Sequence, residues 1–104
     1  MSVVSVYAIF ADGDEAERIG RAVIDERLAA CINILGPVRS IYRWKGAVET
    51  ANEVAAIFKT SDERAGALIT RVGALHSYDV PCIVTWPISK VLGAYADWVE
   101  ESVA

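Results

Sequence analysis

The order of strand-like and helix-like segments restricts the fold of this chain more than any other feature of its sequence. Residues 3–11 form an apolar run rich in β-branched and aromatic side chains, which is typical of a central strand. Apolar residues then recur at helical spacing from Ala16 to Leu28, behind an acidic capping sequence. A second amphipathic helix is predicted after the capping sequence 60–63, and an apolar strand at 82–86 follows it.

Between the two predicted helices the sequence indicates a long hairpin. A strand is expected over 29–35, the Gly36-Pro37 step bends or breaks it, and 38–45 continues as a strand with one largely basic face. Lys45-Gly46 marks the turn, and 53–60 returns. A third predicted helix carries a stripe of apolar residues, namely Val91, Leu92, Tyr95, Trp98 and Val99.

This order predicts a single α+β domain over residues 1–104, with a ferredoxin-like split βαβ arrangement. Its antiparallel sheet would include the long hairpin, and helices would cover one face. No predicted helix remains for the other face. Apolar residues make up 54% of the chain, above the usual range of about 45–50%. We therefore expect other subunits or water to cover the second face.

Charge and composition disfavour several classes of partner. The net charge is −4 and the basic residues are scattered, so neither nucleic acid nor a membrane surface is expected. The opening apolar run is too short to span a bilayer and is not preceded by Lys or Arg, which predicts a cytoplasmic protein. No common catalytic or nucleotide-binding motif occurs, and an enzyme is not the expected class.

The side chains that could carry chemistry each have a structural alternative. His76, the only histidine, either caps the second helix or serves as a metal ligand or a polar group in a pocket. Cys31 is expected to be a buried thiol or a soft-metal ligand, and Cys82 a core residue. Lys59 either extends to the sheet edge or binds an anion. Four aromatic side chains are expected to be packing residues and not part of a cofactor site, namely Tyr42, Trp44, Tyr95 and Trp98.

Several segments together resemble the CutA family. They are Glu26 to Asn33, Ser40 to Gly46, Glu53 to Thr60, His76 to Pro81, and Tyr95 to Trp98. The resemblance covers nearly the whole chain and implies a ferredoxin-like fold in a tight homotrimer, in which hairpin strands of neighbouring subunits pair at their edges. It also implies a link to divalent-cation and copper tolerance. The ring geometry is similar to that of the PII signalling proteins, which bind small anions between subunits.

The copper ligands proposed in that family are a cysteine in the first strand and two adjacent histidines. The matching positions here hold Ala8, Leu75 and His76, so the resemblance leaves His76 as the single matching metal ligand. We expect a divalent metal or copper ion to bind weakly there.

The sequence thus predicts a non-enzymatic homotrimer that binds a metal or a small anionic ligand near the subunit junction. The predicted site residues are Tyr42, Trp44, Glu53, Lys59, His76, Tyr78 and Trp98. The alternative is a structural trimer that organises or anchors a partner protein.

Overall fold

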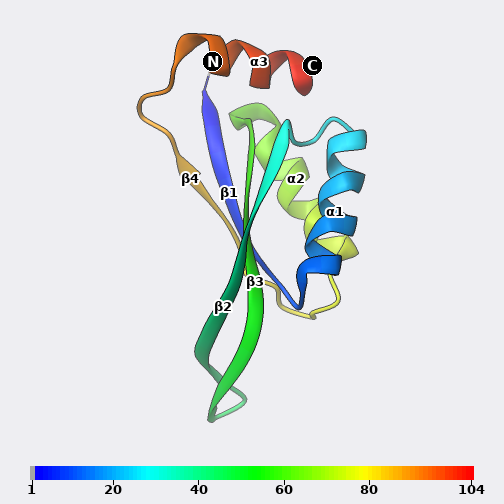
Figure 1. Cartoon of the computed structure of the whole chain (residues 1–104), viewed down its shortest axis with the longest axis vertical. Helices are drawn as coiled ribbons and strands as arrows, with labels where there is room; N and C mark the ends of the chain where they lie inside the picture. The colour runs from blue at the N-terminus through cyan, green and yellow to red at the C-terminus, as the bar shows by residue number, and fades with distance from the viewer. Residues whose placement is uncertain (1) are drawn as a thin grey trace.

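The computed structural model describes residues 2–104 and confirms the α+β fold. Its elements are β1 (Val3–Phe10), α1 (Gly13–Asp25), β2 (Cys31–Trp44), β3 (Ala47–Ser61), α2 (Asp62–Leu75), β4 (Ile83–Pro87) and α3 (Gly93–Ser102). The strands form one antiparallel sheet in the order β2-β3-β1-β4. Helices α1 and α2 cover one face, and α3 lies across the end that holds both termini (Figure 1). The opposite face, called the open face below, carries no helix along most of its length.

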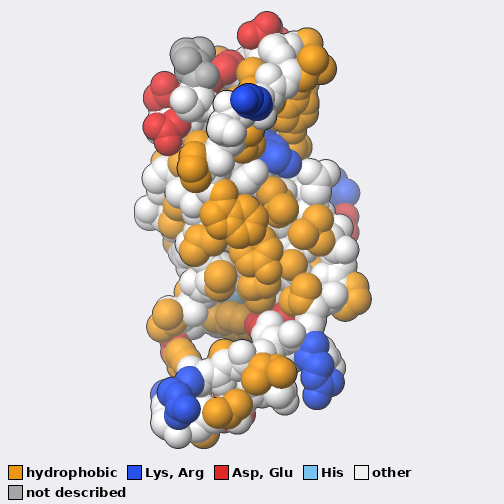
Figure 2. Space-filling model, turned by 90° about the vertical axis from the view of Figure 1, so that its left-hand side faces the viewer, with side chains coloured by type: hydrophobic (Ala, Val, Ile, Leu, Met, Phe, Trp, Pro, Cys, Tyr) orange, Lys and Arg blue, Asp and Glu red, His pale blue; other side chains and the backbone are white. Residues whose placement is uncertain are grey.

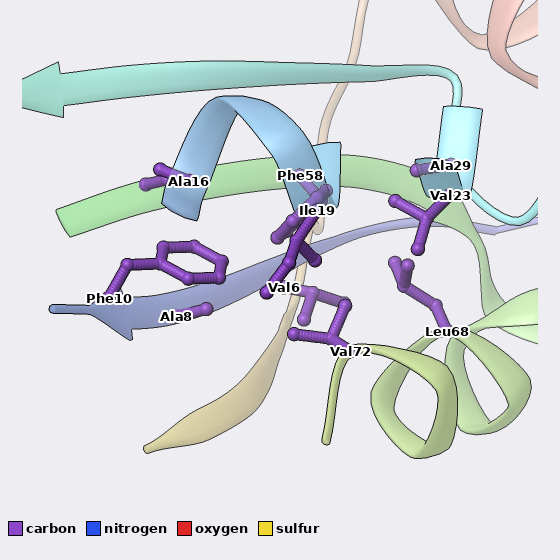
Figure 3. Close-up of a cluster of buried hydrophobic side chains, with 11 residues drawn as sticks. Val6, Ala8, Phe10, Ala16, Ile19, Val23, Ala29, Phe58, Leu68 and Val72 are labelled. Atoms are coloured by element: carbon purple, nitrogen blue, oxygen red, sulfur yellow. The ribbon is translucent and has the colours of Figure 1, made fainter. Parts of the chain in front are cut away.

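The core lies between the sheet and the two helices. β1 is central, and its alternate side chains Val6, Ala8 and Phe10 are fully buried. They meet Ile19 from α1 and Leu68 from α2, as the cluster in Figure 3 shows. The helical spacing found in the sequence therefore places the apolar stripe of each helix against the sheet, as predicted.

Both core helices begin at side-chain caps. Asp12 Oδ1 accepts a hydrogen bond from Glu15 N at 2.8 Å, in the predicted acidic capping sequence. The second cap is Ser61, whose Oγ accepts from Arg64 N at 3.2 Å. Thr60, the first residue of the predicted capping sequence, lies in β3 and does not cap the helix. Its buried hydroxyl donates to the Leu28 carbonyl oxygen at 2.7 Å. The capping sequence 60–63 therefore predicted this helix correctly, but the N-cap is one residue later than Thr60.

The hairpin is longer and more continuous than the sequence indicated. β2 is one strand whose pairing with β3 shifts between Ile34 and Gly36, so the Gly36-Pro37 step bends it without ending it. Lys45 and Gly46 both have positive φ (50° and 82°), as the tight turns of hairpins require. β3 begins at Ala47, six residues before the predicted start at Glu53, because backbone pairing with β2 orders a segment with little apolar character.

The far half of the hairpin extends beyond the body of the molecule. Residues 41–50 are all exposed, and the chain measures 45 × 26 × 22 Å. Its radius of gyration is 14.1 Å, against about 13 Å expected for a compact chain of this length. A hairpin that extends alone into solvent exposes apolar side chains on both strands.

Two predictions for the C-terminal part are wrong. Val91 and Leu92 precede α3, which starts at Gly93, and both are exposed; only the part of the stripe that includes Val99 faces the body. Cys82 lies before β4 and is exposed, because its side chain is on the open face and not in the core. Within residues 2–104, no helix is both long and apolar enough to cross a bilayer.

Candidate functional site

A cavity of about 570 Å³ lies on the open face, between the hairpin and the loop that joins α2 to β4. Figure 2 views this face and shows hydrophobic side chains over its centre and a hollow between that centre and the end of the hairpin. The lining residues come from β1, the hairpin and the loop, and they are Tyr7, Ile9, Ser40, Ile41, Tyr42, Trp44, Glu53, Tyr78, Asp79, Val80 and Cys82. The volume is in the range of about 300–1,000 Å³ that is usual for small-molecule sites.

A hydrogen bond between the loop and the hairpin forms one wall of this cavity. The Tyr78 hydroxyl donates to Glu53 Oε2 at 2.7 Å, and Glu53 is buried. Burial raises the pKa of Tyr78 above its ordinary value, and the hydrogen bond to the Glu53 carboxylate raises it further. The pair therefore consists of a phenol that donates and a carboxylate that accepts, with one negative charge.

The side chain of His76 is fully buried, and its ring lies against that of Tyr78 with centroids 4.8 Å apart. Its Nδ1 accepts a hydrogen bond from Tyr78 N at 3.0 Å, and its Nε2 is 2.7 Å from the Ile9 carbonyl oxygen. A carbonyl oxygen can only accept, so Nε2 carries the hydrogen and the imidazole is neutral in this arrangement. The ring also stacks on Phe10, with centroids 5.3 Å apart. His76 therefore holds the backbone of Tyr78 against β1.

Glu15 secures the same loop from the other side. Its carboxylate accepts hydrogen bonds from Ala11 N and Ser77 N, both at 3.0 Å, and Oε1 is 3.8 Å from His76 Nε2. Burial acts to raise the pKa of Glu15, but the hydrogen bonds from Ser77 and Ala11 outweigh it, so the pKa lies below the ordinary 4.5. The capping sequence of α1 thus also positions the cavity loop.

The structure brings together only part of the predicted site. Four predicted residues line the cavity, namely Tyr42, Trp44, Glu53 and Tyr78, and His76 supports them from behind. Lys59 is six residues from Glu53 along β3, which is about 20 Å at the usual rise of a strand. Trp98 lies on α3, at the opposite end of the molecule from the hairpin tip (Figure 1). Within one chain, neither Lys59 nor Trp98 lines this cavity.

Other lining residues were missed from the sequence. Tyr7 and Ile9 alternate with the core residues of β1, and this alternation could have identified them as open-face residues. Asp79 and Cys82 follow Tyr78 in the sequence and share its loop. The role of Glu15 depends on contact with Ser77, which is 62 residues away, and no local pattern could have shown it.

The predicted metal ligand has no free nitrogen in this conformation. Both ring nitrogens of His76 are hydrogen-bonded to backbone groups, and a metal could bind only if one of these bonds opened. No group of three or more His, Cys, Asp or Glu side chains placed to hold a metal occurs within the described range 2–104. Metal binding at His76 remains a prediction.

The fold and the cavity define this chain as a ferredoxin-like α+β protein with a long hairpin and a site on its open face. Comparison with known proteins gives the family. The CutA1 divalent ion tolerance protein family matches residues 4–102, and this chain belongs to that family.

Two relatives and one solved structure are similar to this chain over most of their length. The divalent-cation tolerance protein CutA of Archaeoglobus fulgidus is 40% identical over 98 residues, covering 94% of this chain and 95% of the relative. The CutA protein of Thermus thermophilus is 44% identical over 87 residues, 84% of each chain. The crystal structure of CutA from Xylella fastidiosa superimposes with a TM-score of 0.96 at 35% identity and covers 100% of both chains.

Proposed function

We propose that this protein acts in divalent-cation tolerance as a non-enzymatic homotrimer, with a ligand site at the subunit junction next to the cavity. Family membership supports the tolerance role, since relatives carry that name. The observation that carries the assembly is the exposed hairpin, where Ile41 and Val48 are 68% and 65% exposed. Apolar side chains on both strands of an extended hairpin are more stable when another chain covers them.

Lys59 and Trp98 fit this proposal as residues contributed by a neighbouring subunit. They lie at the α3 end of the molecule, and the cavity lies near the hairpin (Figure 1). If the hairpin of one chain reaches the α3 end of the next, all seven predicted residues meet at the junction. β2 and β4 are the edge strands of the sheet, and their outer backbone N–H and C=O groups are unpaired. Strands of neighbouring subunits would pair with these groups.

The proposed metal is copper or another divalent ion, bound weakly through His76. Weak binding is expected because the imidazole must first give up a backbone hydrogen bond and leave its contact with Phe10. Titration calorimetry should find affinity in the micromolar range or weaker. His76→Gln should abolish it, while the amide retains hydrogen bonding in the core. Unchanged copper binding in that variant would exclude His76 as the ligand.

A second candidate is a structural trimer that anchors a partner protein. The exposed apolar residues of the hairpin favour it, because such a surface also suits a protein partner. A thermal-shift screen of metals and small molecules distinguishes the two roles, since a ligand that binds the native state raises its melting temperature. A shift with a saturable dose dependence supports ligand binding, and no shift in the whole panel supports the anchoring role.

We propose a cytoplasmic location on the sequence arguments given above. A solved relative, that of Archaeoglobus fulgidus at 38% identity, is described as periplasmic. Fractionation of the source cells, with a cytoplasmic marker protein as reference, tests the location directly.

A further inference from the structure

The two ring nitrogens of His76 are hydrogen-bonded to two different kinds of segment. Nε2 donates to the carbonyl oxygen of Ile9, and Ile9 lies in the central strand β1, where it pairs with Ala55 of β3. Nδ1 accepts from the backbone N–H of Tyr78, which lies in the loop that joins α2 to β4. Movement of this loop would free Nδ1, whereas the partner of Nε2 is fixed in the sheet.

This arrangement determines which nitrogen can bind a metal. Nε2 carries the hydrogen, so the lone pair that a metal needs is on Nδ1. Histidines that bind metals commonly donate their other ring N–H to a backbone carbonyl or a carboxylate, which fixes the ring and its tautomer. Nε2 of His76 already makes such a hydrogen bond to Ile9. The ring is therefore oriented as in a metal-binding histidine, and the N–H of Tyr78 occupies the lone pair.

Two further contacts keep the loop in this closed position. Ser77 N donates to Glu15 Oε2 at 3.0 Å, and the Tyr78 hydroxyl donates to Glu53 Oε2 at 2.7 Å. Glu15 and Glu53 are both buried. These contacts and those of His76 all lie within one chain, so they form whether or not a neighbouring subunit covers the open face.

We propose that this loop controls metal binding at His76, because a metal ion reaches Nδ1 only when the loop has opened. The apparent affinity is then the intrinsic affinity multiplied by the fraction of molecules whose loop is open. By linkage, a bound metal ion also favours the open loop. The inference rests on the metal-binding role proposed above for His76 and adds its regulation, namely the nitrogen that binds and the contacts that oppose binding.

The first test compares zinc binding by the full chain and by Tyr78→Phe in calorimetric titrations. The variant loses the hydrogen bond to Glu53 but keeps the aromatic ring and every charge. Because a hydrogen bond to a charged group contributes to closure, the open fraction should rise, and zinc should bind about tenfold more tightly. Equal or weaker binding by Tyr78→Phe would overturn the inference. Weaker binding is also the result expected if the phenol oxygen were itself a ligand.

Tyr95→Phe is the matched control. It removes a phenol hydroxyl that contacts Cys31 Sγ at 3.4 Å, in α3 and away from the loop. It should bind zinc with the affinity of the parent. A tenfold gain in this variant as well would assign the effect to general loosening of the fold and would contradict control by the loop.

His76→Gln separates this inference from the proposed ligand role. If zinc binds the parent, His76→Gln abolishes binding and Tyr78→Phe binds no more tightly, His76 is the ligand and only the control by the loop is wrong. If zinc binds neither the parent nor Tyr78→Phe, the ligand role itself is wrong, and the inference fails with it. Binding by Tyr78→Phe alone would agree with a loop that excludes the metal.

Nitrogen-15 NMR of the parent gives a result that does not depend on the folding of a variant. Zinc is diamagnetic, and at saturation it should shift the resonance of His76 Nδ1 while Nε2 keeps its hydrogen. Hydrogen exchange of the Tyr78 amide should become faster, because that amide loses its acceptor. An unchanged exchange rate with zinc bound, or loss of the hydrogen from Nε2, would contradict the assignment.

Discussion

The hydrogen bond between Tyr78 and Glu53 is the residue-scale feature that shapes the cavity. Tyr78→Phe removes the donor and leaves a buried carboxylate without its partner. We expect the free energy of unfolding to fall by about 1.5–3 kcal/mol, the usual range for a hydrogen bond to a charged group. Urea denaturation at fixed protein concentration measures it.

Tyr7→Phe is the matched control for this change. Tyr7 lines the same cavity, and its hydroxyl makes no hydrogen bond within the described part of the chain. It should unfold within about 0.5 kcal/mol of the parent. Equal losses in the two variants would show that the contact with Glu53 contributes nothing.

The pH dependence of stability should report on Glu15. Its pKa is lower in the folded chain than the ordinary 4.5, so its contribution is fully present above that value. The contribution is lost as the pH falls through the lowered folded pKa. We therefore expect Glu15→Gln to be less stable than the parent at pH 7, with a difference that shrinks toward pH 3.

Urea denaturation across this pH range checks the prediction, with Glu17→Gln as the control. Glu17 is exposed on the same helix and pairs with Arg21. Exposed pairs contribute little, so Glu17→Gln should follow the parent at every pH. A Glu15→Gln difference that does not depend on pH would mean that its charge has no role in holding the loop.

At the scale of elements, the packing of α1 against β2 depends on Gly20. A Cβ added at Gly20 would lie 2.9 Å from Ile32 Cδ1 and 3.0 Å from its Cγ2. Gly20→Ala should therefore destabilise the fold by about 1–3 kcal/mol, in spite of the better helix propensity of Ala.

Gly66 in α2 provides the comparison. Nothing lies within 4 Å of a Cβ added there, so Gly66→Ala should stabilise the chain by up to about 1 kcal/mol. Thermal or urea unfolding of both variants gives the two signs. A stabilising Gly20→Ala would show that Ile32 can move aside and that the contact is not tight.

The elements were predictable from the sequence because their signals are local. The central strand, both core helices, the Gly36-Pro37 bend and the Lys45-Gly46 turn follow from side-chain periodicity and backbone preference. The position of Cys82 was not predictable in this way. An apolar segment beside a strand does not show which of its residues face the core.

The candidate site was predictable only in part, for a related reason. Tyr42, Trp44, Glu53 and Tyr78 were grouped with the site by resemblance, and the structure brings them together. The buried position of His76 depends on contacts with Ile9 and Phe10, which are far away in sequence. Lys59 and Trp98 were also grouped with the site by resemblance. Within one chain they lie toward the α3 end of the molecule, away from the cavity.

At the scale of the whole molecule, the chain exposes more surface than a compact monomer would. Its accessible surface is 6242 Å², against about 5,700 Å² expected for its mass of 11.3 kDa. The excess arises from a hairpin that extends from the body. The open face also exposes further apolar side chains (Figure 2). Val84 and Trp86 are among the exposed residues. Both features are expected in a subunit whose neighbours cover these surfaces.

The mass of the assembly in solution tests this account most directly. Size-exclusion chromatography with light scattering at micromolar concentration should give about 34 kDa, three times the mass of one chain. A species of that mass that persists on dilution would agree with pairing of hairpins and edge strands between subunits. A mass near 11.3 kDa would contradict the account, because the exposed hairpin and the open face would then have no neighbour to cover them.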